Sequence, residues 1–119
     1  MPRSLNSLAD LTADLREFAR ERDWEKFHDP KSLVLALTGE VGELAELFQW
    51  LPAENVELEF RDPRRKQRAA EEISDVLTYL LRLADVLDID VEAAVRDKLA
   101  DSRIRFAVDD VSGVAPVKE

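Results

Sequence analysis

The chain has 119 residues, of which 45% are hydrophobic and 36% charged, with a net charge of −9 and no cysteine. This length fits one domain with a real core, and the lack of cysteine excludes disulfides and thiolate metal sites. The acidic charge argues against binding to a nucleic-acid polymer, and no apolar run approaches the roughly 20 residues that span a bilayer.

Few glycines, prolines and aromatics accompany this composition, which is typical of a helix-rich globular chain. Nothing at the N-terminus combines a basic region with an apolar run of signal-peptide length. We therefore expect a cytoplasmic, all-α protein with no membrane partner.

The first predicted helix spans residues 5–22, where apolar side chains recur at steps of three and four from Leu5 onward. A short connector follows and carries Trp24, Phe27 and His28, which is the only histidine in the chain. The two aromatic side chains have two interpretations, ordinary hydrophobic packing or a face on which a base stacks.

The second and third predicted helices share one start signal, an Asp-Pro pair. Aspartate caps the first turn, and proline lacks an N–H group that this turn would leave unpaired. Asp29-Pro30 predicts a helix over residues 30–51, and Asp62-Pro63 predicts one over residues 63–87. The acidic stretch 53–61 has no sustained period, so we expect a loop there.

The fourth predicted helix spans residues 91–108, with Asp90 as its cap. Beyond it, residues 109–119 contain glycine and proline and are expected to form a loose tail. Because no repeat or linker divides the chain, we expect one domain of four-helix-bundle type over residues 1–108.

Carboxylates recur every third residue in the segment TGEVGELAELFQW. On a helical projection Glu40 interrupts the apolar stripe and Glu43 is its neighbour, whereas Glu46 lies further round, toward solvent. Glu72 and Asp75 have the same spacing and also border an apolar stripe. Half-buried like charges destabilise a helix unless protons, basic partners or cations compensate, so the two pairs predict a shared site.

Oxygen ligands without cysteine favour Mg²⁺ or Mn²⁺ over zinc or copper. The chain has a single histidine, so it cannot supply the two Glu-x-x-His motifs of a di-iron bundle. The alternative is a non-enzymatic helical interaction module, in which the acidic pairs form a solvated surface.

Two glycines, Gly39 and Gly42, lie between the glutamates, and each costs about 1 kcal/mol relative to alanine inside a helix. We interpret them as sites where another helix or a nucleotide approaches closely. In the fourth predicted helix, Lys98, Ser102 and Arg105 fall within about 60° of one another on the projection. This polar and basic face either holds phosphates or serves the helix dipole.

Three motifs resemble, in order, the all-α nucleoside triphosphate pyrophosphohydrolases of the MazG-like superfamily, and most closely its dCTP pyrophosphatase branch. These motifs are RDWEKFH at residues 22–28, GEVGELAELFQW at 39–50 and EEISDVL at 71–77. The resemblance implies that catalytic Mg²⁺ binds to Glu40, Glu43, Glu72 and Asp75. The candidate substrate-binding residues are Trp24, His28, Trp50, Tyr79, Lys98, Ser102 and Arg105.

The family cleaves a nucleoside triphosphate between its α and β phosphates and releases the monophosphate and pyrophosphate. It assembles as dimers or as tetramers built from two dimers, with sites between subunits. The resemblance thus implies an Mg²⁺-dependent enzyme, a homodimer or homotetramer, that removes dCTP or a modified dCTP from the nucleotide pool. On chemical grounds Glu43 and Glu46 are the two candidates for general base. A related activity on dUTP or other non-standard deoxynucleotides is the alternative.

Three departures from the family pattern leave the base preference open. Ser102 stands where many relatives have asparagine, no proline follows Phe106, and Leu15 occupies a position that is histidine in the animal dCTP enzymes.

Overall fold

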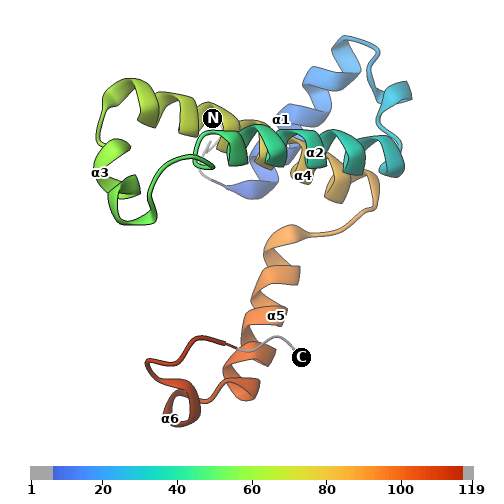
Figure 1. Cartoon of the computed structure of the whole chain (residues 1–119). Coiled ribbons are helices and arrows are strands. Elements are labelled where there is room, and N and C mark those ends of the chain that lie inside the picture. Colours follow the sequence, from blue (N-terminus) through green and yellow to red (C-terminus); the bar gives the residue numbers. More distant parts are fainter. Residues whose placement is uncertain (1–6, 117–119) are drawn as a thin grey trace. The chain divides into compact units, whose positions relative to one another are not determined.

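The computed structural model describes residues 7–116, and helices are the only regular elements within that range (Figure 1). This finding confirms the predicted all-α class. No helix between residues 7 and 116 is both long enough and apolar enough to cross a membrane. The longer helices are α1 (Leu8–Glu21), α2 (Pro30–Glu46), α4 (Pro63–Val86) and α5 (Val91–Arg105), and the short ones are η1 (Glu25–Phe27), η2 (Ala53–Asn55), α3 (Val56–Glu59) and α6 (Val108–Val111).

The predicted start signals cap their helices as expected. Asp29 accepts a hydrogen bond of 2.9 Å from the backbone N–H of Ser32, and Asp90 accepts one of 3.0 Å from that of Ala93. Asp62 caps α4 in the same way. Each cap pairs an N–H that the first helical turn would otherwise leave unsatisfied.

Several predicted boundaries are wrong. The helix expected over residues 30–51 ends at Glu46, and tighter turns with bonds between residues three apart follow it. The expected loop at 53–61 contains η2 and α3, and the ring of Phe60 after α3 stacks on Phe48 with centroids 4.5 Å apart. The first helix begins at Leu8, capped by Ser7, and the predicted residues 5 and 6 lie outside the described range. The tail expected to be loose begins within the short helix α6.

The structure divides into two compact units, Met1–Ile89 and Asp90–Glu119, and the single domain expected over residues 1–108 stays a prediction. The boundary follows the turn at Asp88, whose φ is +56°, a left-handed conformation that aspartate tolerates better than most residues. No residue of α5 is buried. Its apolar side chains therefore find no core in their own unit, and the exposed ones include Val95, Leu99 and Ile104.

Within the first unit, α2 and α4 run side by side in opposite directions, and α1 packs against α4 (Figure 1). Leu33 of α2, Leu81 of α4 and Ala19 of α1 are each only 1% exposed. Burial of a leucine side chain contributes about 1.5–3 kcal/mol. This small core fixes α2 against α4 and so positions the acidic residues described next.

Candidate functional site

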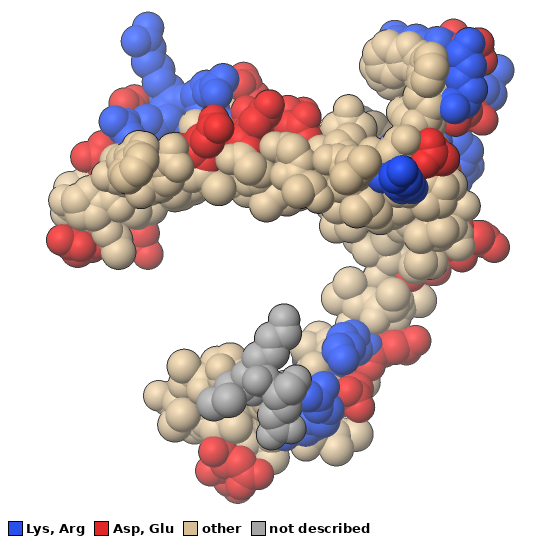
Figure 2. Space-filling view, turned by 45° about the vertical axis from the view of Figure 1, so that its right-hand side comes forward, with Lys and Arg blue, Asp and Glu red and all other residues tan. Residues whose placement is uncertain are grey.

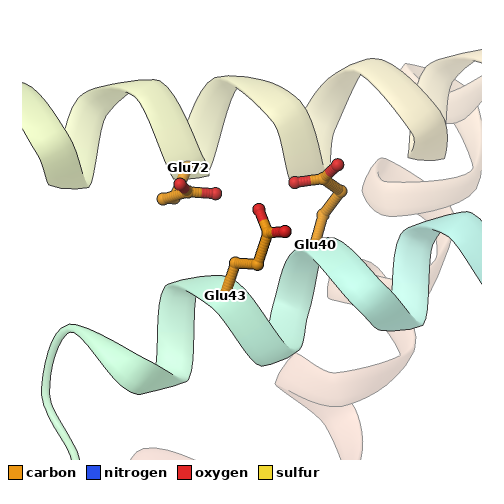
Figure 3. A group of neighbouring side chains, drawn as sticks. All are labelled: Glu40, Glu43 and Glu72. Atoms are coloured by element: carbon orange, nitrogen blue, oxygen red, sulfur yellow. The ribbon is translucent and has the colours of Figure 1, made fainter.

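Three glutamates from two helices meet between α2 and α4, and we call them the glutamate cluster (Figure 3). Glu40 and Glu43 come from α2 and Glu72 faces them from α4, with one carboxylate oxygen of each within 4.8 Å of the others. Glu40 and Glu43 share a face because residues three apart are neighbours on a helix. The structure thus joins one predicted acidic pair to a member of the other.

The cluster concentrates negative charge where solvation is poor. Glu72 is only 7% exposed, and the Oε2 atoms of Glu40 and Glu72 are buried without a hydrogen-bond partner among the described residues. Burial raises the pKa of both groups, and the Glu43 carboxylate raises the two pKa values further. Buried anionic oxygens without protein partners are suited to coordinate a hard divalent cation.

Asp75 is the fourth predicted metal ligand, and it lies beside the glutamate cluster rather than in it. Its negative charge contributes to the raised pKa of Glu40 and of Glu72. Asp75 and Glu40 also line a common cavity. The two residues therefore stand at the border between the cluster and that cavity.

The cavity has a volume of about 200 Å³ and is bounded by α1, the connector after it, α2 and α4. Trp24 stands edge-on to Phe18 with ring centroids 5.8 Å apart, yet it remains 45% exposed, so part of it can still receive a ligand. Three predicted substrate-binding residues are brought together here, Trp24, His28 and Tyr79. The full lining is Leu15, Phe18, Ala19, Trp24, His28, Glu40, Asp75, Thr78, Tyr79 and Arg82.

Arg82 is a buried arginine of this cavity that the sequence analysis did not select. It is 4% exposed and donates from Nη1 to Asp85 at 2.9 Å and from Nε to Nδ1 of His28 at 3.2 Å. Arg16 of α1 donates to both oxygens of Asp85, at 2.6 and 2.8 Å. Hydrogen bonding to Arg16, with the charge of both guanidinium groups, lowers the pKa of Asp85. The available signal was a charge inside the apolar run LLRLA at residues 80–84, the same kind of interruption that drew attention to Glu40.

A second group that the sequence analysis missed is basic. Arg64, Arg65 and Arg68 line a cavity together with Leu47 and Phe60. Arg68 lies 3.7 Å from Glu72 and offsets part of its charge. Figure 2 shows basic and acidic side chains gathered beside one another on the first unit. The run RRKQR at residues 64–68 was the signal for this group.

Four candidate substrate-binding residues are not part of that cavity lining. Trp50 is in the turn after α2, is 86% exposed and does not line the cavity. Lys98, Ser102 and Arg105 belong to α5 in the second unit, where Arg105 approaches Asp101 at 3.8 Å.

The space around Gly39 and Gly42 is open. A Cβ atom added at either position would meet nothing within 4 Å, its own helical neighbours aside, among the described residues. The expected close approach of another helix is therefore not found among the described helices of the first unit. The alternative expectation, approach of a nucleotide, stays a prediction.

The sequence and the fold of this chain have known counterparts. The chain belongs to the MazG-like family, which it matches over residues 36–115. This match, together with the relatives below, confirms the resemblance drawn from the sequence motifs.

Among curated proteins, dCTP pyrophosphatase 1 of Bos taurus is 48% identical over 102 residues, which cover 86% of this chain and 60% of that protein. The protein of the same name from Homo sapiens is 47% identical over 100 residues, which cover 84% and 59%. The chain thus spans about 60% of the length of these curated relatives.

Among solved structures, a pyrophosphatase from Archaeoglobus fulgidus superposes with a TM-score of 0.78 at 38% identity. The superposition covers 90% of this chain and 98% of that one.

Proposed function

We propose that the chain is an Mg²⁺-dependent nucleoside triphosphate pyrophosphohydrolase that converts dCTP, or a modified dCTP, to the monophosphate and pyrophosphate. The proposal rests on the position of Glu40, which belongs to the glutamate cluster and also lines the aromatic cavity. A nucleotide needs two adjoining sites of this kind, one for its phosphates and one for its base. The names of the bovine and human relatives support the choice of dCTP.

The acidic residues fit a divalent cation, because two of their buried oxygens have no hydrogen-bond partner among the described residues. Glu40, Glu43 and Glu72 would hold Mg²⁺, or Mn²⁺ in its place, with Asp75 beside them as the fourth ligand. When bound, such a cation neutralises phosphate charge and lowers the pKa of a coordinated water.

Protein groups account for the other requirements of the reaction. Glu43 is the exposed member of the cluster, and either it or Glu46 would accept the proton of the attacking water. Trp24 and Tyr79 would hold the base, since stacking on an aromatic side chain contributes roughly 1–3 kcal/mol. The cavity walls would exclude water from the base.

We further infer that copies of the chain assemble as a homodimer or homotetramer, with Trp50, Lys98, Ser102 and Arg105 completing sites between subunits. A monomer rarely exposes large contiguous apolar surface. Here many large apolar side chains of the first unit are exposed, among them Leu35 (62%), Ile73 (54%), Val41 (46%) and Leu80 (41%). Light scattering after gel filtration tests the assembly, and a monomer at micromolar concentration with Mg²⁺ present would contradict it.

Incubation with each dNTP and NTP, together with dUTP and 5-substituted dCTP, followed by separation of the products, tests the reaction. We expect release of monophosphate and pyrophosphate in the presence of Mg²⁺, fastest for a cytosine deoxynucleotide, and none with EDTA. Formation of diphosphate and orthophosphate would refute the assignment.

Glu72→Gln tests the glutamate cluster, because it keeps the side-chain size and removes one anionic oxygen ligand. We expect at least a tenfold weaker Mg²⁺ affinity and at least a hundredfold lower turnover, because loss of an outer-shell partner alone typically costs about 10- to 100-fold in affinity or activity. Glu57→Gln is the matched control, since Glu57 is exposed on α3. Equal behaviour of the two variants would favour the non-enzymatic interaction module.

A further inference from the structure

The hydrogen bond between Arg82 and His28 determines where the imidazole proton lies. An arginine guanidinium carries five N–H donors and no acceptor. Because Nε of Arg82 donates to Nδ1 of His28, Nδ1 must be the unprotonated nitrogen. His28 is then a neutral imidazole with its hydrogen on Nε2, the other ring nitrogen.

The position of Arg82 is itself fixed by a chain of charges across two helices, α4 and α1. Asp85, one turn further along α4, accepts from Nη1 of Arg82, and Arg16 of α1 holds both oxygens of Asp85. The Arg82 side chain is 5% exposed, whereas that of Arg16 is 53% exposed. The buried guanidinium therefore has one acceptor in Asp85, which restrains its position, and a second in the imidazole.

The surroundings of His28 disfavour a second proton. Burial lowers the pKa of His28, and the positive charge of Arg82 on α4 lowers it further. Glu25 of η1 opposes them in part. The neutral ring required by the hydrogen bond is thus also the form favoured at neutral pH.

We propose that Arg82 is a positioning residue that holds His28 as the Nε2–H tautomer, so that the cavity offers a hydrogen-bond donor to an acceptor atom of the ligand. Both side chains line the cavity with Trp24 and Tyr79. The ligand group of this chemistry is a flat heterocycle with a carbonyl oxygen or an unprotonated ring nitrogen, as on the O2 and N3 edge of cytosine. The choice of a nucleotide base as the ligand rests on the proposed function. The assignment of the tautomer rests only on the hydrogen bond between Arg82 and His28.

The single histidine makes the tautomer directly measurable. A long-range ¹H–¹⁵N spectrum of the untagged, ¹⁵N-labelled full chain contains one imidazole and separates protonated from unprotonated nitrogens. We expect protonated Nε2, unprotonated Nδ1 and a midpoint of titration below that of a free histidine. A wild-type spectrum with the proton on Nδ1 would overturn the proposal without any variant.

Arg82→Met removes the donor and keeps much of the apolar stem. In this variant we expect the ¹⁵N chemical shift of Nδ1 to move toward that of a free imidazole nitrogen, and we expect the titration midpoint of His28 to rise. Arg82→Lys is the second variant, in case the first does not fold, because lysine keeps the charge beside Asp85 but lacks the guanidinium Nε. Arg20→Met, on the exposed part of α1, is the matched control with an unchanged spectrum. A folded Arg82 variant with the wild-type spectrum would overturn the positioning role.

Binding of dCMP without metal, followed by calorimetry, tests the ligand step. We expect Arg82→Met or Arg82→Lys, and likewise His28→Phe, to weaken dCMP binding at least tenfold, and Arg20→Met to leave it unchanged. Two results would overturn the proposal that His28 donates a hydrogen bond to the ligand. One is wild-type affinity for dCMP in a variant with an altered imidazole spectrum, and the other is no binding of dCMP to the wild-type chain. The proposed hydrolysis is scored separately by product release with Mg²⁺, so its failure would not alter the imidazole result.

Discussion

Replacement of Asp85 by alanine should destabilise the protein strongly, because it removes the counterion of a buried guanidinium. The Asp85 side chain is 16% exposed and that of Arg82 5% exposed, with 2.9 Å between the paired atoms. Removal of one partner from a buried pair typically costs 3–5 kcal/mol, most of it the penalty of the charge left behind. Since His28 and partial hydration compensate part of the unpaired charge of Arg82, we expect the free energy of unfolding to fall by about 3 kcal/mol.

Arg16→Ala is the internal comparison, because it removes the other arginine of the same carboxylate. Arg16 is 53% exposed, and an exposed ion pair contributes at most about 1 kcal/mol. The double variant Asp85→Ala/Arg82→Met should recover at least half of the loss, since no unpaired buried charge remains. A hydrophobic replacement of a buried pair is often neutral or better.

Urea unfolding at fixed protein concentration, followed by tryptophan fluorescence, measures these free energies of unfolding. Because the pKa of Asp85 is lowered in the folded state, its contribution is present above the unfolded pKa and lost as the pH falls through the folded pKa. The difference between wild type and Asp85→Ala should therefore shrink only below about pH 4. Equal costs for Asp85→Ala and Arg16→Ala, or no recovery in the double variant, would refute the reasoning.

Three further outcomes are expected. The pKa of Glu40 is raised in the folded state, so this group stabilises the metal-free fold below its unfolded pKa, and the stabilisation is lost as the pH rises through the folded pKa. Melting curves from pH 4.5 to 7.5 should show this loss of stability in the wild type and less of it in Glu40→Gln. The loss should be small when Mg²⁺ saturates the site. Trp24→Ala should raise the KM for dCTP about tenfold with a smaller change in kcat, whereas Phe27→Ala, outside the cavity lining, should not; equal kinetics for the two variants would contradict the assignment of the base site. Leu81→Ala should lower the free energy of unfolding by about 3 kcal/mol in urea, since Leu81 is 1% exposed; a loss under 1 kcal/mol would show that α4 repacks.

Local signals were predictable from the sequence. The Asp-Pro helix starts at Asp29 and Asp62 depend on bonds within three residues, so sequence alone places them correctly. The pairing of Glu40 with Glu43 likewise follows from helical periodicity. The sequence also predicted that half-buried carboxylates on two helices would converge. In the structure Glu72 of α4 faces the α2 pair.

Features that depend on distant partners were not predictable in the same way. α2 ends earlier than its apolar pattern suggested, in a segment where Phe48 stacks on Phe60 from beyond α3. The bond from Arg16 to Asp85 joins residues 69 positions apart. Neither pairing has a local pattern, because each arises only once the helices are packed.

Because α4 is continuous, it fixes the distance between the residues along it. Glu72 and Asp75 near its middle belong to the acidic region, and Arg82 near its end belongs to the cavity, with no glycine or proline from residue 64 to 86. At 1.5 Å per residue, the ten steps from Glu72 to Arg82 span about 15 Å along one rigid axis. Insertion of a single residue between them would lengthen that span and turn one end by about 100° relative to the other. The length and twist of this one segment therefore set which ligands can reach both ends at once.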